Sequence, residues 1–117
     1  MGMDKELNRN IKNFRDFRGM TQEDLASHVG KTKNVISNWE RGDNNPDVDS
    51  VERICLALDV TPNEIFGWDK CKEYEEYVYK KEQKKIRIME LEEQKKKIQY
   101  EIDNLMNDLD DKKEEDT

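Results

Sequence analysis

Positions 21–42 constrain the fold more than any other stretch, because they carry start and stop signals for two helices. Thr21 can accept a hydrogen bond from an unsatisfied backbone N–H, and Asp24 three residues later completes a capping box. Gly30 follows the last apolar residue of the first helix, where a left-handed residue costs least in glycine. Thr32 can cap a second helix. The two predicted helices span about residues 22–29 and 33–41.

Apolar side chains in both helices repeat at spacings of three and four residues, which places them on one face of each helix. They are Leu25, Ala26 and Val29 in the first helix, and Val35, Ile36 and Trp39 in the second. Two helices joined by so short a turn form a helix-turn-helix motif, whose second helix enters the major groove of DNA. The sequence therefore predicts a DNA-reading helix at residues 33–41.

Further helix signals flank this motif. An apolar stripe predicts a first helix over about residues 7–18, after a polar and frayed stretch at 1–6. Asp47 can cap a fourth helix over about residues 48–58. Thr61 begins the sequence Thr-Pro-Asn-Glu, which combines a cap, a proline at the first helical position and a capping-box glutamate. This signal predicts a short fifth helix, and with no strand pattern present we expect an all-α domain with one core.

Residues at fixed spacing across these helices follow a known pattern. Within the motif they are Thr21-Gln22, Leu25-Ala26, Gly30, Ile36-Ser37, Trp39-Glu40 and Gly42. Outside it they are Ile11, Phe14, Arg15, Gly19-Met20, Pro46, Val51, Ile54, Ala57-Leu58, Val60 and Thr61–Phe66. Over about residues 7–67 the chain resembles the Cro/phage-repressor-type (Xre-like) helix-turn-helix family. The resemblance implies a five-helix repressor-like fold and a role in transcription regulation through DNA binding.

The chain is acidic, which bears on its capacity to bind DNA. The formal net charge is −7 over 117 residues, with −3 on residues 1–68 and −4 on residues 69–117. Because salt screens charges beyond about 10 Å, the local charge of the face that meets the phosphates decides binding. Lys31, Lys33 and Arg41 lie in or beside the motif. We therefore expect modest, salt-sensitive affinity for each DNA-binding domain.

The composition also divides the chain in two. With 33% hydrophobic and 42% charged residues, the chain is too polar to pack entirely around one core. We predict a DNA-binding domain at residues 1–68 and a helical dimerisation segment at residues 69–117. From position 70 to 113 there is neither proline nor glycine, and good helix formers dominate. The residues from 110 onward predict a charged, disordered tail.

Apolar residues of the C-terminal segment follow the heptad a/d pattern typical of a coiled coil. We call the six residues at these positions the seam: Ile88, Leu91, Ile98, Ile102, Leu105 and Leu109. Lys95 occupies the one a position between them that is not apolar. The same heptad positions nearer the N-terminus hold Tyr74, Tyr77, Lys81 and Lys84. We expect two copies to pair through the seam, with a solvated single helix as the alternative. Parallel pairing is simplest, but an antiparallel pair, or a hairpin bent near residues 80–85, is also compatible with the sequence.

The start of the second motif helix holds the residues expected to read bases, because N-terminal residues of a recognition helix reach base edges. These residues are Thr32, Lys33, Asn34, Val35 and Asn38. Lysine can donate to guanine, asparagine can pair with adenine, and valine can touch a thymine methyl group. Phosphate contacts are expected from Gln22, Lys31, Arg41, Asn44 and Asn45. For the asparagines at 38, 44 and 45, the alternative is that they only cap helices or stabilise turns.

Two further roles are implied by the family resemblance. Gln22 matches a residue that holds a phosphate and braces the recognition helix. Arg15 and Glu40 match residues that form an ion pair between the first and third helices. Removing one partner of a buried pair leaves a charge uncompensated, at a cost of about 3–5 kcal/mol, so we assign this pair to structure and not to recognition.

No group of residues indicates catalysis, a metal or a cofactor. His28 is the only histidine, and it lies among polar residues. The sequence has no HExxH motif, glycine-rich phosphate loop or cluster of cysteine and histidine. We expect Cys55 to be a small core residue and Cys71 a plain free thiol. We therefore predict that the chain is not an enzyme, and with no signal peptide or membrane span in the sequence we expect it in the cytoplasm.

These features together predict a sequence-specific DNA-binding transcriptional regulator of the phage- or mobile-element repressor type. It would act as a homodimer on a two-fold operator in double-stranded DNA, controlled either by a protein partner such as an anti-repressor or through the level of the protein itself. The alternative is an antitoxin-like or otherwise partner-controlled regulator, whose C-terminal helix binds another protein such as a toxin.

Overall fold

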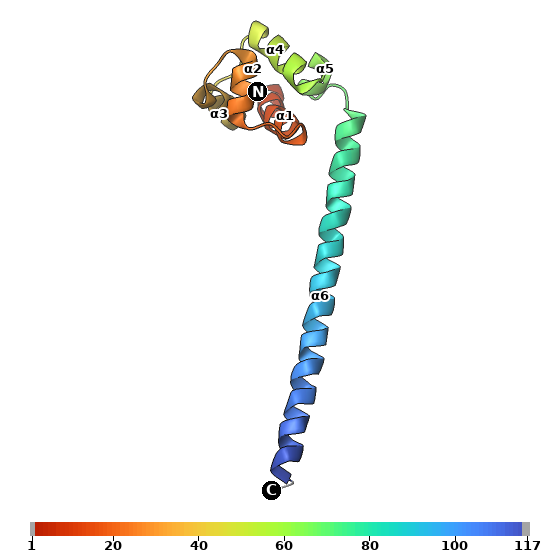
Figure 1. Ribbon diagram of the computed structural model, residues 1–117. Helices are drawn as coiled ribbons and strands as arrows, with labels where there is room; N and C mark the ends of the chain where they lie inside the picture. Colours follow the sequence, from red (N-terminus) through yellow and green to blue (C-terminus); the bar gives the residue numbers. More distant parts are fainter. Residues whose placement is uncertain (1, 116–117) are drawn as a thin grey trace. The chain divides into compact units, whose positions relative to one another are not determined.

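The computed structural model describes residues 2–115, and side chains from residue 6 to residue 110; within these residues all regular structure is helical. The helices, shown in Figure 1, are α1 (Gly2–Phe17), α2 (Gln22–Val29), α3 (Lys33–Arg41), α4 (Val48–Leu58), α5 (Pro62–Ile65) and α6 (Lys72–Glu115). The prediction of an all-α fold, with five helices followed by one long helix, is confirmed. The chain divides into an N-terminal unit, Met1–Tyr77, and a C-terminal unit, Val78–Thr117.

The ends of α2 and α3 follow from the local signals in the sequence. The Thr21 hydroxyl accepts a hydrogen bond from the Asp24 backbone N–H at 3.1 Å, and the Asp24 carboxylate accepts one from the Thr21 N–H at 2.9 Å. Gly30 ends α2 with a φ of +68°, a left-handed conformation that an L side chain would make costly. Thr32 then caps α3, since its hydroxyl accepts from the Val35 N–H at 3.4 Å. Gly30 at the end of α2 and the Thr32 cap at the start of α3 therefore set the tight turn of the motif.

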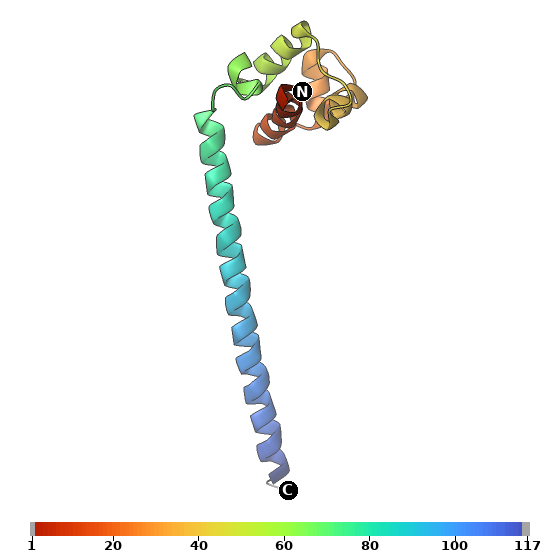
Figure 2. The same cartoon turned by 180° about the vertical axis from the view of Figure 1, so that it is seen from behind.

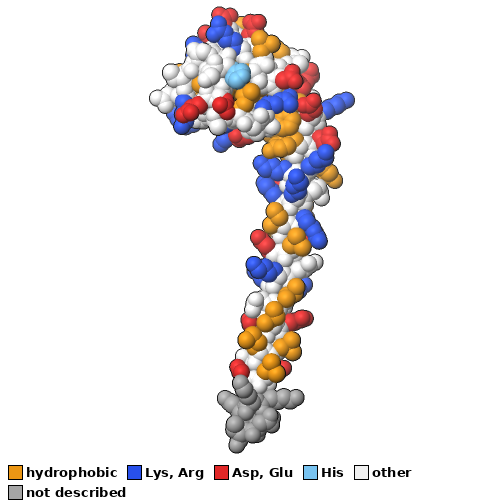
Figure 3. All heavy atoms as spheres, viewed as in Figure 1, with side chains coloured by type: hydrophobic (Ala, Val, Ile, Leu, Met, Phe, Trp, Pro, Cys, Tyr) orange, Lys and Arg blue, Asp and Glu red, His pale blue; other side chains and the backbone are white. Residues whose placement is uncertain are grey.

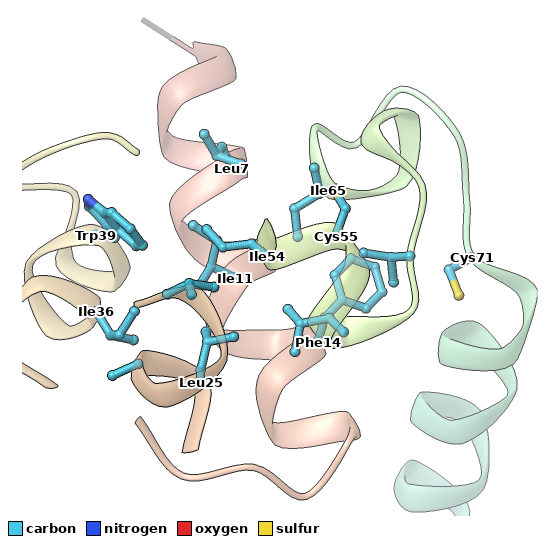
Figure 4. Close-up of a cluster of buried hydrophobic side chains, with 14 residues drawn as sticks. Leu7, Ile11, Phe14, Leu25, Ile36, Trp39, Ile54, Cys55, Ile65 and Cys71 are labelled. Carbon is cyan, nitrogen blue, oxygen red and sulfur yellow. The ribbon is translucent and has the colours of Figure 1, made fainter. Parts of the chain in front are cut away.

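The core of the N-terminal unit is built by side chains from all five short helices. Those that are completely buried are Ile11, Val29, Leu25, Ile36, Ile54, Leu58 and Ile65. Figure 4 shows Leu25 and Ile36 directed toward Ile11 and Ile54; α2 packs on α4, and α3 packs on α1. Full burial of such a side chain contributes about 1.5–3 kcal/mol. The inner face of α3 is thereby fixed to the core, and its opposite face is left toward solvent.

The first turns of α6 belong to the same core. The ring of Tyr74 lies 5.0 Å from that of Phe14, and the ring of Tyr77 lies 5.0 Å from that of Phe17, measured between centroids. These tyrosines occupy heptad positions in line with the seam, but they pack on α1. Cys71 is a free thiol as expected, yet it is buried at the edge of the core, and this burial raises its pKa. The heptad pattern therefore does not extend to the two tyrosines as coiled-coil positions, because their rings pack on α1.

Both chain ends depart from the sequence prediction. Helix α1 begins at Gly2, where a frayed segment was expected up to residue 6, and this stretch contains no proline to prevent a helix. Helix α6 continues to Glu115, where a disordered tail was expected from residue 110; residues 116–117 lie outside the described part. This stretch contains neither proline nor glycine, so nothing in its sequence interrupts the helix.

Helix α6 is continuous over its 44 residues, as the two opposite views in Figures 1 and 2 show. At 1.5 Å per residue it is about 66 Å long. The hairpin bent near residues 80–85 is therefore not formed. No helix within residues 2–115 combines the length and the apolar character that crossing a bilayer requires.

Candidate nucleic-acid interface

The outer face of α3 presents the residues predicted to read bases. Lys33 and Asn34 are exposed at the start of the helix, and Val35 and Asn38 are half-buried on its flank. Thr32 is also exposed, but its hydroxyl is engaged in capping the helix. The first turn of α3 therefore presents the Lys33 ammonium group and the Asn34 carboxamide to solvent. They lie at the N-terminal end of the helix, where backbone N–H groups without intrahelical partners favour anions.

A buried hydrogen-bond network holds α3 from behind. Arg15 of α1 donates from Nε to Glu40 Oε2 at 2.6 Å and from Nη2 to Glu40 Oε1 at 3.0 Å. The two side chains are 9% and 4% exposed, and the hydrogen bond with Glu40 raises the pKa of Arg15. Gln22 of α2 donates from Nε2 to the same Oε1 at 3.1 Å. Three helices are thus tied to one carboxylate, and the structure places Gln22 where it braces α3.

At the other end of α3, Arg41 and Asn38 are brought into contact. The Arg41 guanidinium donates to the side-chain oxygens of Asn38 and Ser37, and its Nε donates to Asp43 at 3.1 Å. All of these groups lie at the surface or half-buried. Two residues predicted for different tasks, one for a base and one for a phosphate, are therefore partners within the protein.

A shallow hollow of about 350 Å³ runs beside α3 and unites residues from two loops. Its lining consists of Lys31, Val35, Trp39, Asn44, Asn45, Asp47 and Ser50. Lys31 comes from the turn of the motif, and the two asparagines come from the loop after α3, so the structure places these predicted contacts together. Asp47 adds a negative charge to this hollow. Its carboxylate accepts a hydrogen bond from the Ser50 backbone N–H at 2.9 Å. Hydrogen bonds from Ser50, and to a lesser extent the nearby charge of Lys31, lower the pKa of Asp47.

Asn8 was not predicted as part of the site, although it is buried and positions the edge of the interface. Its Nδ2 donates to the Trp39 carbonyl at the end of α3, and it lies 3.5 Å from the Asn44 carbonyl and 3.3 Å from Asn45 Oδ1. The two amide hydrogens can serve two of these acceptors at a time. The sequence held one signal: Asn8 lies seven residues before Arg15, so both fall on the side of α1 that faces α3. These contacts also show that the Asn45 side chain stabilises the loop.

Comparisons with known proteins agree with this geometry. A helix-turn-helix family model matches residues 11–65. The chain is 32% identical over 65 residues to the uncharacterised HTH-type transcriptional regulator y4dJ of Sinorhizobium fredii, an alignment that covers 56% of this chain and 84% of that protein. The chain belongs to the helix-turn-helix family, and the predicted resemblance is confirmed.

Two further relatives indicate the range of this family. The chain is 31% identical over 64 residues to the antitoxin PezA of Streptococcus pneumoniae, covering 55% of this chain but only 40% of the antitoxin. Among solved structures, the restriction-modification controller protein C.Esp1396I matches with a TM-score of 0.52 and 33% identity, covering 57% of this chain and 86% of that one. Each alignment leaves over a third of this chain, and more than half of the antitoxin, unmatched.

Proposed function

We propose that the chain is a sequence-specific DNA-binding transcriptional regulator that reads the major groove with the outer face of α3. The observation that carries this proposal is the asymmetry of α3. Its inner face is fixed by Ile36, Trp39 and the Glu40 network, and its first turn presents Lys33 and Asn34 to solvent. A recognition helix needs this combination of a fixed axis and unengaged polar side chains.

Each predicted contact then has a definite role. In the groove, Lys33 donates to guanine and Asn34 pairs with adenine, and Val35 touches a thymine methyl group. Asn38 also contacts a base once the Arg41 guanidinium leaves the Asn38 carboxamide and binds a phosphate. Gln22, Lys31, Asn44 and Asn45 surround α3 and contact the sugar-phosphate backbone, which fixes the register on the duplex.

The second part of the proposal is dimerisation through α6, with residues 1–68 as the DNA-binding domain and 69–117 as the dimerisation segment. The seam residues are between 43% and 66% exposed, so six large apolar side chains are open to water on one helix. Figure 3 shows hydrophobic side chains gathered along this part of α6. A second copy of α6 would cover them, and two α3 helices would then bind the two halves of a two-fold operator, as a repressor requires.

Selection of bound duplexes from random DNA, followed by substitution, tests the reading face. Lys33→Ala, Asn34→Ala and Asn38→Ala are each expected to cost about 1–3 kcal/mol in affinity and to relax preference at one base pair. Lys12→Ala, which removes an exposed lysine of α1, is the control and should leave the preferred sequence unchanged. If all three α3 variants keep the affinity and the preference of the parent chain, α3 does not read DNA.

The antitoxin-like alternative rests on the match to PezA and on the same exposed seam. In that case the seam would be covered by a different protein. Purification of the chain from its native cells separates the two possibilities: a homodimer that binds DNA alone supports the repressor, and a stable complex with a second protein through α6 supports the alternative.

A further inference from the structure

Lysines interrupt the apolar layers of α6, and they respond differently to the two directions in which helices can pair. By the heptad pattern of the seam, Lys95 is an a residue and Lys84 is a d residue. In a parallel pair each a or d residue faces its own copy, so each lysine would face an identical lysine. In an antiparallel pair each a residue faces a d residue of the other copy. A lysine then faces an apolar residue instead of another lysine, provided that the register places an apolar residue opposite it.

The charges beside the seam also have a direction. The g positions of successive heptads hold Lys80, Arg87, Gln94, Glu101 and Asp108. They are basic in the first half of the helix, neutral in the middle and acidic in the second half. Since g residues of antiparallel helices face each other, such a gradient is complementary to its own reversed copy.

We infer that two copies of α6 pair in antiparallel orientation, with Ile88 of one copy facing Leu105 of the other. This inference rests on the dimer proposed above and specifies its interface. In the same register Leu91 faces Ile102, so four apolar layers form around the centre of the contact. All four side chains are exposed in the single chain and gain burial on pairing.

The lysines of the seam fit this register. Lys95 faces Ile98 of the second copy, and Lys84 faces Leu109. The aliphatic stem of each lysine covers the apolar side chain opposite, and its ammonium group reaches water at the edge of the interface. No lysine faces a lysine among the layers from position 84 to position 109.

The flanking charges fit it as well. Arg87 faces Asp108 of the second copy, and the reverse pair forms at the other end of the interface. Gln94 faces Glu101, whose carboxylate also lies beside Lys95 of the first copy. A parallel pair would gain contacts between Arg87 and Glu92, but it would also place Lys80 against Lys85 on both sides.

Neighbouring antiparallel registers are less favourable. A shift by one heptad that places Ile88 opposite Ile98 leaves Leu109 facing Tyr77, whose ring already packs on Phe17. A shift by one heptad in the other direction places Glu101 opposite its own copy. The register with Ile88 facing Leu105 avoids both problems.

Distances between spin labels test the orientation on the full chain. Tyr79 and Tyr100 lie at exposed f positions outside the interface. In the inferred dimer Tyr79 is level with position 114 of the second copy, which separates two labels at Tyr79→Cys by about 52 Å along the axis. Tyr100 is level with position 93 of the second copy, so two labels at Tyr100→Cys lie about 10 Å apart along the axis. This variant therefore gives a short distance in either orientation.

Three outcomes are distinguishable. A long distance at position 79 with a short one at position 100 supports the inference. Short distances at both positions show a parallel dimer, which overturns the inference and leaves the proposed dimer intact. No short distance at position 100, with a monomer in sedimentation, overturns both. The chain without added cysteine is the labelling control, because Cys55 and Cys71 are buried.

A charge swap gives an independent test. Arg87→Glu and Asp108→Arg should each weaken the dimer, by about tenfold, because each creates two like-charge contacts. The double variant should recover the parent dimer constant if Arg87 and Asp108 face each other. In a parallel dimer each residue faces a different partner, so a double variant weaker than either single variant would contradict the inference.

Discussion

The two units of the chain acquire helical structure in different ways. In the N-terminal unit, short helices are bounded by caps and joined by a shared core in which seven apolar side chains are completely buried. In the C-terminal unit, one helix persists without a core, and its apolar seam is exposed. Most helical stability in proteins comes from packing and not from propensity. The N-terminal unit therefore has a core of its own, whereas the C-terminal unit would gain one only through the pairing of α6 proposed above.

The difference should be visible in how each unit responds to protein concentration. The melting temperature of a fold stabilised by an internal core is independent of protein concentration. The melting temperature of a fold stabilised by a partner rises with protein concentration. The boundary between these behaviours should fall after Tyr77, because Tyr74 and Tyr77 are packed on α1. The variants below separate or modify the two units.

Truncation after Glu82 should have the largest effect, because it removes the seam and keeps every contact of the N-terminal unit. Operator affinity is expected to fall by about 10²–10⁴-fold, as the two half-site contacts are no longer linked. The melting of the remaining unit should stay cooperative and independent of concentration. Sedimentation and DNA titration measure these effects, and truncation after Gly67 is the contrast, since it also strips Cys71 and Tyr74 from the core. A truncated chain that stays dimeric would place the interface elsewhere, for example at the apolar groove of about 660 Å³ beside Val48 and Leu56.

Breaking the buried ion pair should have the next largest effect, confined to the N-terminal unit. Arg15→Ala or Glu40→Ala leaves one buried charge without its partner and should lower the free energy of unfolding by about 3–5 kcal/mol. Asp43→Ala, which removes the exposed partner of Arg41, is the control and should cost less than about 1 kcal/mol. Urea titration gives both values. Equal, small losses in all three variants would show that the Arg15–Glu40 pair is not a structural element.

Filling the seam should affect only the C-terminal unit. Lys95→Leu replaces a charged a residue by an apolar one and should tighten the dimer by about tenfold. The melting of the N-terminal unit should not change, because position 95 belongs to the C-terminal unit. Sedimentation equilibrium and differential scanning calorimetry follow the two units separately. A dimer weakened by this substitution would show that Lys95 contributes an essential contact.

The smallest effect concerns the pH dependence of the capped helices. Hydrogen bonds from Thr21 lower the pKa of Asp24 in the folded chain. A lowered folded-state pKa means that the ionised cap contributes stability above the unfolded pKa, and that this contribution is lost as the pH falls through the folded pKa. Asp24→Asn keeps a capping side chain but removes the charge, so it should flatten the stability profile below about pH 4. Glu52→Gln makes the same change in net charge without altering a cap, and should retain the slope. Identical profiles for Asp24→Asn and the parent chain would exclude this role.

The same contrast explains what the sequence could predict. The ends of α2, α3, α4 and α5 were predictable because each depends on residues within one turn, such as the Thr21–Asp24 box. The exposed residues at the start of α3 followed from the motif and the family resemblance. The packing of Tyr74 on Phe14 was not predictable, since it joins residues sixty positions apart and competes with a heptad pattern that looks continuous. Asn8 was missed for the same reason, because its acceptors lie in the loop after α3.

The number of chains bound to one selected operator duplex tests whether α3 reads half a site and α6 joins two reading units. We predict two copies of the full chain per duplex, bound cooperatively to two related half-sites, and one copy of the chain truncated after Glu82 on a duplex with a single half-site. A full chain that binds as one copy, with the affinity of the truncated chain, would contradict the account.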